Sequence, residues 1–334
     1  MRSREIRLAA RPSGTPTDTD FELAEVDLED PAGGELLIRN EVMSVDPYMR
    51  PRMNDVPSYV PPFRVGEPLY GGAVGRVAAS RHPDFAEGDW VFSMLGWREV
   101  ARSDGTGVRK LDPDRAPPST ALGVLGMPGL TAYVGLLDIG QPKEGETVFV
   151  SGAAGAVGSI VGQIAKLKGC RTIGSAGSPE KVAWLRELGF DVAFDYHETR
   201  PRDALRGEPI DVYFDNVGGE HLEAAIGAAN PFARLVECGM ISRYNDERAE
   251  PGPRNMAMIV PKRLLLQGFI VMDRADRARD FYRDMGEWVR EGKVRYRETY
   301  VDGIENAPGA LLGLFGGENI GKMLVRLRSA EASS

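Results

Sequence analysis

The chain has 334 residues, with 41 Lys and Arg against 49 Asp and Glu, so its formal net charge is −8. This length exceeds what a single hydrophobic core usually serves and predicts two lobes. The negative charge argues against nucleic acid or an anionic membrane as the main partner, because both attract positively charged surfaces. No apolar stretch reaches the roughly 18–20 residues needed to cross a bilayer, and the N-terminus lacks an apolar signal region, so we expect a cytoplasmic protein without membrane association.

Residues 1–120 are predicted to form a small, mostly antiparallel β lobe. Short alternating apolar segments broken by Gly and Pro recur through this part of the chain, for example over 35–39, 71–77 and 88–92. A polar, Pro-rich segment over 112–118 follows and indicates a boundary loop.

Residues 121–295 are predicted to form a second domain in which strands alternate with helices. We expect strands over 147–151, 170–174, 211–215, 234–238 and 264–271. This alternation is typical of a parallel, doubly wound sheet. The segment 277–290 is predicted to be an amphipathic helix whose apolar face carries Phe281, Met285, Trp288 and Val289. Residues 296–334 are expected to return to the first lobe with strands over 296–301 and 322–327, and the tail 329–334 is expected to fray.

The most informative segment is a glycine-spaced loop formed by Gly152, Gly155 and Gly158. An apolar run precedes it, and a helical pattern follows, ends at Gly169 and leads into a second apolar run. Strand, glycine loop, helix and strand in this order form the phosphate-binding half of a dinucleotide fold. The loop must be small because a pyrophosphate binds against backbone N–H groups at the helix N-terminus.

The sequence also favours NADP(H) over NAD(H). A site for NAD usually has an acidic residue at the end of the second strand, where it binds the ribose 2′-hydroxyl, but this strand ends without one. Ser178 is predicted to be a helix N-cap, Pro179 the first helical residue and Gly189 the stop. Lys181 then lies in the first turn, where the helix dipole disfavours a cation. A 2′-phosphate ligand explains this lysine, and the alternative is a solvated surface side chain.

No metal site is predicted. The chain has three histidines, His82, His197 and His221, and two cysteines, Cys170 and Cys238, in no spacing typical of metal ligands. Both cysteines lie in apolar runs, so we expect small buried side chains rather than a disulfide.

Several motifs resemble the medium-chain dehydrogenase/reductase superfamily. Within it, the chain is similar to the zinc-free branch of leukotriene B4 dehydrogenase/prostaglandin reductases and NADP-dependent double-bond reductases of the 2-alkenal and curcumin type. The matching segments cover nearly the whole chain and are 45–50, 126–133, 152–169, 214–219, 238–245, 267–271 and 317–322.

The resemblance implies an α/β fold with a Rossmann domain and a GroES-like β lobe built from both ends of the chain. It further implies a homodimer, a substrate bound between the lobes, and NADPH-dependent reduction of the C=C bond of α,β-unsaturated ketones or aldehydes, with hydride added to the β-carbon. Zinc-dependent relatives have a Cys and a His-Glu pair where this chain has Asp46, Gly72 and Ala73. A quinone reductase and a catalytically idle NADPH-binding protein are the alternatives.

The cofactor contacts of the family fall on matching positions of this chain. The resemblance implies pyrophosphate contacts at Ala154, Gly155, Ala156 and Val157, and 2′-phosphate contacts at Lys181 and Tyr196. Contacts along the ribose and diphosphate are implied at Asn216, Cys238, Gly239, Met240, Ile241, Ser242 and Tyr244. Phe269, Ile270 and Val271 would flank the nicotinamide, and Asn319 would close over the cofactor. Without the resemblance, Tyr196 is an ordinary strand-end aromatic, Asn216 a turn residue and Phe269 a core residue.

The proton donor is where the sequence departs from the family. Many double-bond reductases carry a tyrosine, a proposed acid, at the position of Pro261, which has no proton to donate. Tyr59 is the first candidate to replace it, and its alternative role is that of a hydrophobic lid residue. The candidate substrate-pocket residues are Tyr48, Tyr59, Met127 and Tyr244.

Overall fold

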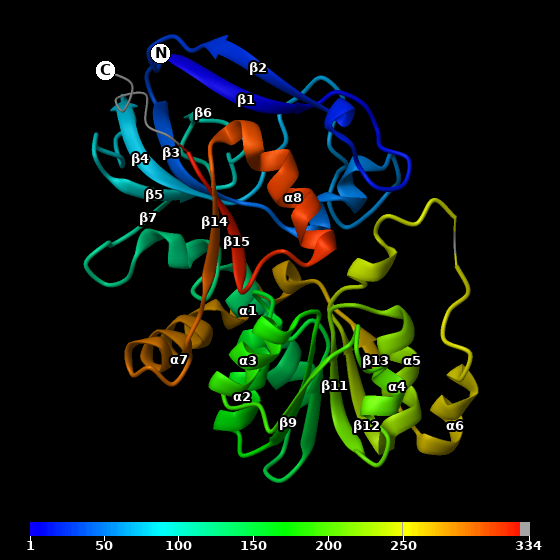
Figure 1. Ribbon diagram of the computed structural model, residues 1–334. Helices are drawn as coiled ribbons and strands as arrows, with labels where there is room; N and C mark the ends of the chain where they lie inside the picture. The colour runs from blue at the N-terminus through cyan, green and yellow to red at the C-terminus, as the bar shows by residue number, and fades with distance from the viewer. Residues whose placement is uncertain (249, 328–334) are drawn as a thin grey trace. The chain divides into compact units, whose positions relative to one another are not determined.

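The computed structural model describes residues 1–248 and 250–327, which form two compact units (Figure 1). Unit 1 contains residues 1–122, 298–319 and 323–327 of the described chain. Unit 2 contains Gly123–Arg297 and Ile320–Lys322. The tail 329–334, which we expected to fray, lies outside the described residues.

Unit 1 is built on a seven-stranded sheet with the order β14-β15-β3-β4-β5-β7, in which β6 also pairs with β3. The bounds are β3 Leu36–Ser44, β4 Ala73–Ser80, β5 Trp90–Ser93, β6 Val100–Ser103, β7 Arg109–Lys110, β14 Glu298–Asp302 and β15 Lys322–Arg326. The pairings of β3 with β4, β6 and β15, and of β5 with β4 and β7, are antiparallel. A separate antiparallel hairpin consists of β1 Arg2–Leu8 and β2 Phe21–Asp27. Helix α8 (Ala307–Gly316) packs in the core of this unit through residues such as Leu311.

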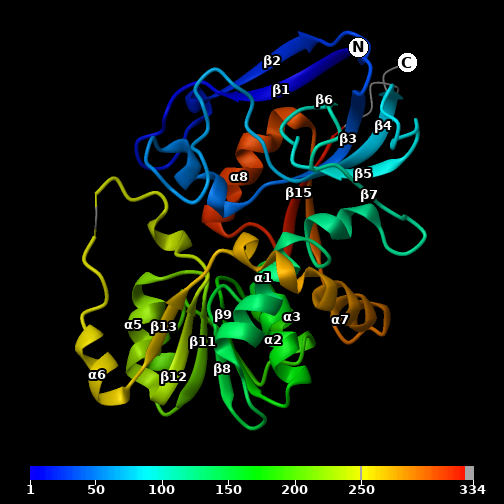
Figure 2. The same cartoon turned by 180° about the vertical axis from the view of Figure 1, so that it is seen from behind.

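Unit 2 is built on a six-stranded parallel sheet with the order β10-β9-β8-β11-β12-β13 (Figure 2). Its strands are β8 Thr147–Val150, β9 Arg171–Ala176, β10 Val192–Asp195, β11 Ile210–Asp215, β12 Ala229–Glu237 and β13 Leu265–Gly268. Its α-helices are α1 Met127–Val134, α2 Gly158–Leu167, α3 Pro179–Glu187, α4 Pro201–Ala204, α5 Gly219–Ala228, α6 Ile259–Lys262 and α7 Ala278–Arg290. A π-helical segment, Gly135–Gly140, extends α1. The predicted fold class, a doubly wound parallel sheet with a mostly antiparallel β lobe, is confirmed.

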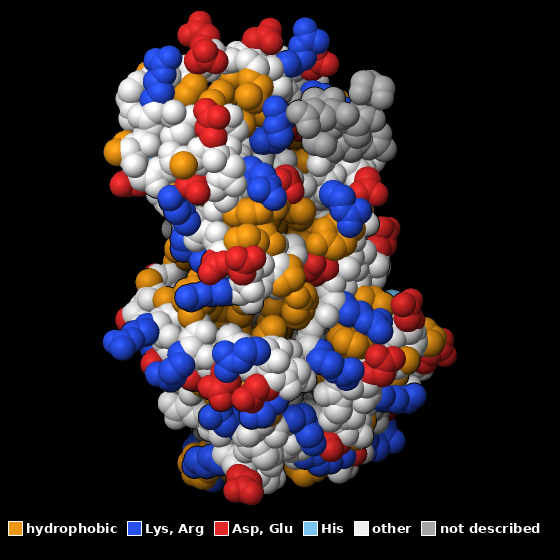
Figure 3. All heavy atoms as spheres, turned by 90° about the vertical axis from the view of Figure 1, so that its left-hand side faces the viewer, with side chains coloured by type: hydrophobic (Ala, Val, Ile, Leu, Met, Phe, Trp, Pro, Cys, Tyr) orange, Lys and Arg blue, Asp and Glu red, His pale blue; other side chains and the backbone are white. Residues whose placement is uncertain are grey.

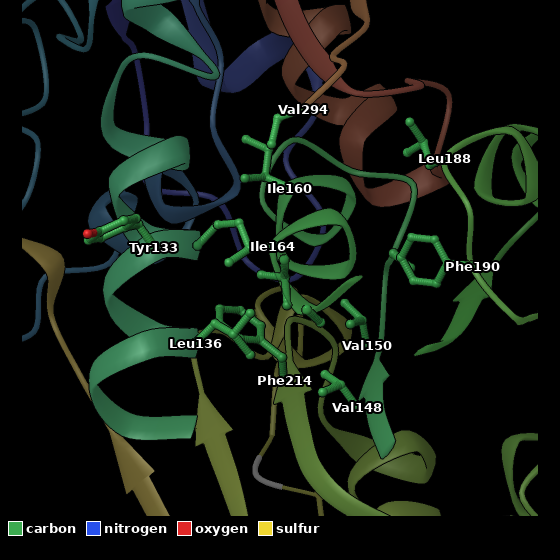
Figure 4. Packing of buried hydrophobic residues seen from close by; sticks show 14 of the residues in the cluster. Tyr133, Leu136, Val148, Val150, Ile160, Ile164, Leu188, Phe190, Phe214 and Val294 are labelled. Atoms are coloured by element: carbon green, nitrogen blue, oxygen red, sulfur yellow. The ribbon is translucent and has the colours of Figure 1, made fainter. Parts of the chain in front are cut away.

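The two faces of the parallel sheet bury different side chains because successive residues of a strand point to opposite sides. Val148, Val150 and Phe214 belong to one core cluster, which also contains residues of α1, α2 and α7 (Figure 4). Phe149 and Tyr213, their neighbours in the chain, belong to a second cluster with residues of α5. Helices on both faces are what a parallel sheet requires, since each face must be covered.

The predicted helix over 277–290 is confirmed as α7. Phe281 and Met285 are fully buried, and Trp288 and Val289 pack partly buried against the same core. The apolar spacing of this segment therefore indicated its buried face correctly.

Two strand predictions differ from the structure. The strand expected over 264–271 ends at Gly268, because β12, its neighbour among the described strands, ends at the paired residue Glu237. A 3-10 helix, Val271–Arg277, follows instead. The strand expected over 234–238 begins earlier, at Ala229. Its pairing with β11 shifts register between Ile210 and Val212. Phe232, which follows Pro231, has a left-handed backbone conformation (φ 67°). A proline in a sequence usually indicates the end of a strand, but a strand tolerates proline at an edge or at a bulge.

Acidic and basic side chains are interspersed over the described part of the face shown in Figure 3. This distribution gives that face no continuous basic stripe of the kind that tracks a phosphate backbone. No helix within residues 1–248 and 250–327 is long and apolar enough to cross a membrane.

Candidate cofactor site

The glycine loop between β8 and α2 has the geometry of a phosphate cradle. Gly152 has a positive φ of 57°, and the N–H of Gly155 donates to its carbonyl oxygen at 3.0 Å. A Cβ on Gly158 would lie 2.6 Å from the same oxygen, so only glycine fits this position. Helix α2 starts at Gly158 and directs its first N–H groups at the loop, which favours an anion there. The predicted pyrophosphate contacts Ala154, Gly155, Ala156 and Val157 all lie in this loop.

A second loop, between β9 and α3, has the features predicted for a 2′-phosphate site. Strand β9 ends at Ala176 and is followed by Gly177 and Ser178 without a carboxylate. The Ser178 hydroxyl accepts the Lys181 N–H at 3.3 Å, which confirms the predicted cap, and Pro179 begins α3. Burial lowers the pKa of Lys181. This partial desolvation strengthens the interaction of the ammonium with an anion and argues against a fully solvated side chain.

Tyr196, the other predicted 2′-phosphate residue, lies against the same loop. A Cβ on Gly177 would lie 2.6 Å from the Tyr196 hydroxyl, so the glycine makes room for the phenol. The Tyr196 ring packs between His197 and His221, with centroids 4.4 and 5.3 Å away. His197 is exposed and its Nδ1 lies 3.1 Å from the Gly177 carbonyl oxygen, as a hydrogen-bonded surface residue does. Burial lowers the pKa of His221 to about 4, so this ring stays neutral near pH 7.

The loops that follow β11 and β12 bring together most of the remaining predicted contacts. The Asn216 side-chain amide donates to the Ser151 carbonyl oxygen at 2.8 Å, so it also ties β11 to β8. The Ile241 N–H donates to the Asn216 carbonyl at 3.2 Å, and the Ser242 hydroxyl donates to the Val217 carbonyl at 2.6 Å. The Tyr244 hydroxyl accepts the Met240 N–H at 3.3 Å and lies close to Gly239. Residues 216–219 and 238–244 therefore form one hydrogen-bonded surface.

Cys238 belongs to this surface but has no feature of a reactive thiol. Burial raises its pKa to about 12, with Asp215 and Glu237 adding to the shift, so the sulfur stays protonated. Both cysteines are free.

Other predicted residues are placed less closely around these loops. Phe269 is partly buried, packs against the core beside Phe214 and Gly135, and so also fills the role of a core residue. Ile270 and Val271 follow it and are partly buried, and Asn319 belongs to unit 1. Their contacts with a cofactor remain predictions.

The sequence analysis missed a row of polar side chains beneath these loops. Ser151, Asp215 and Glu237 end or follow three adjacent strands, and Asp215 is paired in register with Glu237. The Ser151 hydroxyl donates to Asp215 Oδ1 at 2.9 Å. The available signal was a polar residue at the end of successive apolar runs, but the order of the strands, which makes them neighbours, was not readable.

Unit 1 holds Tyr48 and Tyr59, two of the four predicted substrate-pocket residues. Tyr48 is partly buried in the 3-10 helix Pro47–Met49. Its burial raises the pKa of the phenol well above the usual value, and the Asp46 carboxylate raises it further, while Tyr59 and Tyr70 are close enough to contribute. Tyr59 is 56% exposed. The other two, Met127 and Tyr244, belong to unit 2, where Met127 begins α1 and is 37% exposed.

The loop that carries Tyr59 is anchored by Arg52. The Arg52 guanidinium donates to the Pro61 carbonyl oxygen at 3.0 and 3.2 Å. It also lies over the rings of Phe63 and Tyr70, 4.3 and 4.2 Å from their centroids. These contacts hold the end of the loop while Tyr59 itself stays accessible.

The positions that bear zinc ligands in zinc-dependent relatives have a different character here. Asp46 is buried and accepts the Ser44 hydroxyl, and the space at Gly72 is lined by Leu122 and Phe92. Among the described residues, no group of three or more His, Cys, Asp or Glu could hold a metal ion.

Comparisons with known proteins agree with this architecture. Residues 4–111 match the family described as the N-terminal domain of oxidoreductase, and residues 156–290 match the family described as zinc-binding dehydrogenase. The chain is 48% identical to the NADPH-dependent curcumin reductase of Escherichia coli, over 98% of this chain and 97% of that protein. It is 45% identical to prostaglandin reductase 1 of Rattus norvegicus, over 94% of this chain and 95% of that protein.

The chain belongs to the medium-chain dehydrogenase/reductase superfamily, in the branch of the curcumin, prostaglandin and 2-alkenal reductases. A crystal structure of CurA from Vibrio vulnificus in complex with NADPH superposes with a TM-score of 0.93 at 47% identity, over 98% of this chain and 99% of that one. The resemblance stated from the motifs is thereby confirmed. The name of the second matched family mentions zinc, but the donor set at Asp46, Gly72 and Ala73 does not fit a zinc ion.

Replacement of Lys181 tests the 2′-phosphate site. We expect Lys181→Ala to raise the apparent KM for NADPH by about tenfold or more, because a charge-assisted bond to phosphate contributes more than about 1.4 kcal/mol. The KM for NADH should stay nearly unchanged. Arg186→Ala, which removes an exposed cation at the other end of α3, is the matched control and should leave both constants unchanged. Equal losses with both cofactors would show that Lys181 does not bind the 2′-phosphate.

Independence from metal is a second expected outcome. Chelator treatment should leave activity intact, and elemental analysis should find far less than one zinc per chain, since these residues cannot assemble a first ligand shell. Protein purified without a metal-affinity tag is the proper sample. Stoichiometric zinc in that sample would contradict the prediction.

Proposed function

We propose that this protein is an NADPH-dependent reductase of the C=C bond of α,β-unsaturated ketones or aldehydes. The observation that carries the proposal is the cofactor geometry of unit 2: a glycine cradle at Gly152–Gly158 and a second loop without an acid, flanked by Lys181 and Tyr196. Supporting it are the activities named for the relatives, which are NADPH-dependent curcumin reductase, prostaglandin reductase and NADP-dependent 2-alkenal reductase.

The residues present fit NADPH. A Cβ at Gly158 would strike the Gly152 carbonyl, and one at Gly177 would strike the Tyr196 phenol, so both loops need glycine to keep this tight backbone geometry. Backbone N–H groups at the start of α2 would hold the pyrophosphate, and the Lys181 ammonium would hold the 2′-phosphate. When bound, NADPH supplies the hydride that the β-carbon receives.

The protein must also stabilise the negative charge that gathers on the substrate's carbonyl oxygen. A hydrogen-bond donor placed at such an oxygen in a water-poor site contributes about 2.7–4 kcal/mol to lowering the barrier. Pro261 offers no donor, and it lies in α6, where the neighbouring Lys262 donates to the carbonyls of Ile226, Gly227 and Ala229. We assign the donor role to Tyr59, which is exposed and whose phenol can donate a hydrogen bond.

Two other functions remain distinct candidates: a quinone reductase with the same cofactor, and an NADPH-binding protein without catalytic activity. A panel of enones, enals and quinones is tested as substrates, and turnover is measured as the loss of NADPH absorbance. We expect turnover with enones or enals. Turnover restricted to quinones would support the first alternative. NADPH binding without any turnover would support the second.

We further propose that the protein acts as a homodimer in the cytoplasm. The family resemblance supports the dimer, and the composition of the chain supports the location. The molar mass measured by light scattering at micromolar concentration tests whether the protein is a dimer.

Substitution of Tyr59 tests the donor assignment. We expect Tyr59→Phe to lower turnover by about one to three powers of ten with little change in NADPH affinity, as the loss of a transition-state hydrogen bond does. Tyr282→Phe removes an exposed hydroxyl on α7 and should retain normal turnover. If Tyr59→Phe keeps normal turnover and only weakens substrate binding, Tyr59 is a packing residue of the pocket.

A further inference from the structure

Asp215 and Glu237, which we call the carboxyl pair, lie side by side under the loops assigned to the cofactor. They end the adjacent parallel strands β11 and β12 and are paired in register, so their side chains point to the same face of the sheet. The residue after Asp215 is Asn216, and the residue after Glu237 is Cys238, both predicted cofactor contacts. The pair is therefore one residue away from two of the four loops of the site.

Asp215 is fully buried and organises the first of these loops through one oxygen. Its Oδ1 accepts the backbone N–H groups of Val217 and Gly218, both at 2.8 Å. The same oxygen accepts the hydroxyls of Ser151 at 2.9 Å and Tyr213 at 2.6 Å. Four donors on one oxygen describe a carboxylate that carries its charge.

The remaining three carboxyl oxygens of the pair have no hydrogen-bond donor among the described residues. Asp215 Oδ2 and both carboxyl oxygens of Glu237 are shielded from solvent, and no donor among the described residues reaches them. Two ionised carboxylates cannot be held in contact at such a place, because each would face a buried like charge. A single proton carried by Glu237 and donated to Asp215 Oδ2 removes the like-charge repulsion and gives that oxygen a donor, and the Glu237 carboxyl is within hydrogen-bonding reach of Asp215.

We propose that Glu237 is a neutral carboxylic acid that donates a hydrogen bond to ionised Asp215. In this role Glu237 is a positioning residue for the cofactor. This inference rests on the proposed NADPH-dependent function and adds the residue pair that holds the loops 216–219 and 238–244 together. Without the proton on Glu237, the two strand ends repel each other, and the loops that follow them separate.

Among the described residues, only burial and Asp215 contribute to the raised pKa of Glu237, and no cation does. The titratable groups nearby are Tyr213 on β11, Cys238 next in the chain and His221 on α5, which packs against this face. Burial raises the pKa of the phenol and of the thiol and lowers that of the imidazole, so all three stay neutral near pH 7. Burial, followed by the adjacent Asp215 charge, raises the pKa of Glu237 to about 8.

The pair therefore has a definite effect on stability. A carboxyl group whose folded-state pKa lies above its unfolded value binds more protons in the folded state between the two values. Its contribution to stability is fully present below the unfolded pKa of about 4.3 and is lost as the pH rises through about 8. Substitution by Gln keeps a neutral donor and abolishes this dependence.

The experiment compares NADPH affinity as a function of pH in the wild-type chain and in Glu237→Gln, read by NADPH fluorescence. For the wild type, a requirement for one proton with a pKa near 8 predicts a rise in Kd of about tenfold between pH 7 and pH 9. For Glu237→Gln, the Kd should match the wild type at pH 7 and change by less than about twofold over the same range. Glu291→Gln, which removes an exposed carboxylate at the end of α7, should keep the wild-type profile.

A second measurement separates this inference from the proposed function. Thermal unfolding without cofactor should show a midpoint that falls between pH 5 and pH 9 in the wild type more steeply than in Glu237→Gln. The difference reports the shared proton even if the protein fails to bind NADPH, an outcome that would contradict the proposed function alone. Identical pH profiles of the wild type and Glu237→Gln in both measurements would overturn the inference.

Discussion

The hydrogen bonds that converge on Asp215 hold the site together, since this carboxylate joins the ends of neighbouring parallel strands to the turn that follows. Its Oδ1 accepts hydroxyls from β11 and from the residue after β8, and backbone N–H groups from Val217 and Gly218. In a parallel sheet the carboxyl ends of all strands lie on one edge, where ligands of doubly wound folds bind. Fixing the strand ends to one another therefore fixes the loops that contact the ligand.

This arrangement explains why the site is built from main-chain geometry and a few side chains. Gly158 and Gly177 allow a tight packing that a Cβ would disrupt, against the Gly152 carbonyl and the Tyr196 phenol respectively. We propose that Lys181 supplies the charge for the 2′-phosphate, and burial lowers the pKa of its ammonium group. A partly desolvated lysine near a strand end without an acid would discriminate between two cofactors that differ by one phosphate.

The sequence contained the local features of this fold, and it lacked the features that depend on strand order. The Gly152–Gly158 loop, the Ser178 cap and the apolar face of α7 were all predicted, because turn conformation, capping and helical periodicity are properties of neighbouring residues. The early end of β13 was not, because it depends on where β12 stops. The carboxyl pair escaped for the same reason: Asp215 and Glu237 are 22 positions apart in sequence, and only the register of β11 and β12 makes them neighbours. The assigned site residues follow from the family motifs, which mark positions far apart in the chain that periodicity alone does not connect.

Loss of the tyrosine at position 261 changes what the rest of the protein must provide. A donor to an enolate must be protonated and must be able to approach the oxygen. Tyr48 meets the first condition fully, since burial and Asp46 raise the pKa of its phenol, but its partial burial limits its reach. Tyr59 sits on a loop fixed near its far end by the Arg52–Pro61 hydrogen bonds and is more than half exposed, so it can move toward a substrate. Tyr59 contributes, after burial and Asp46, to raising the pKa of the Tyr48 phenol, so the two tyrosines lie near each other in unit 1.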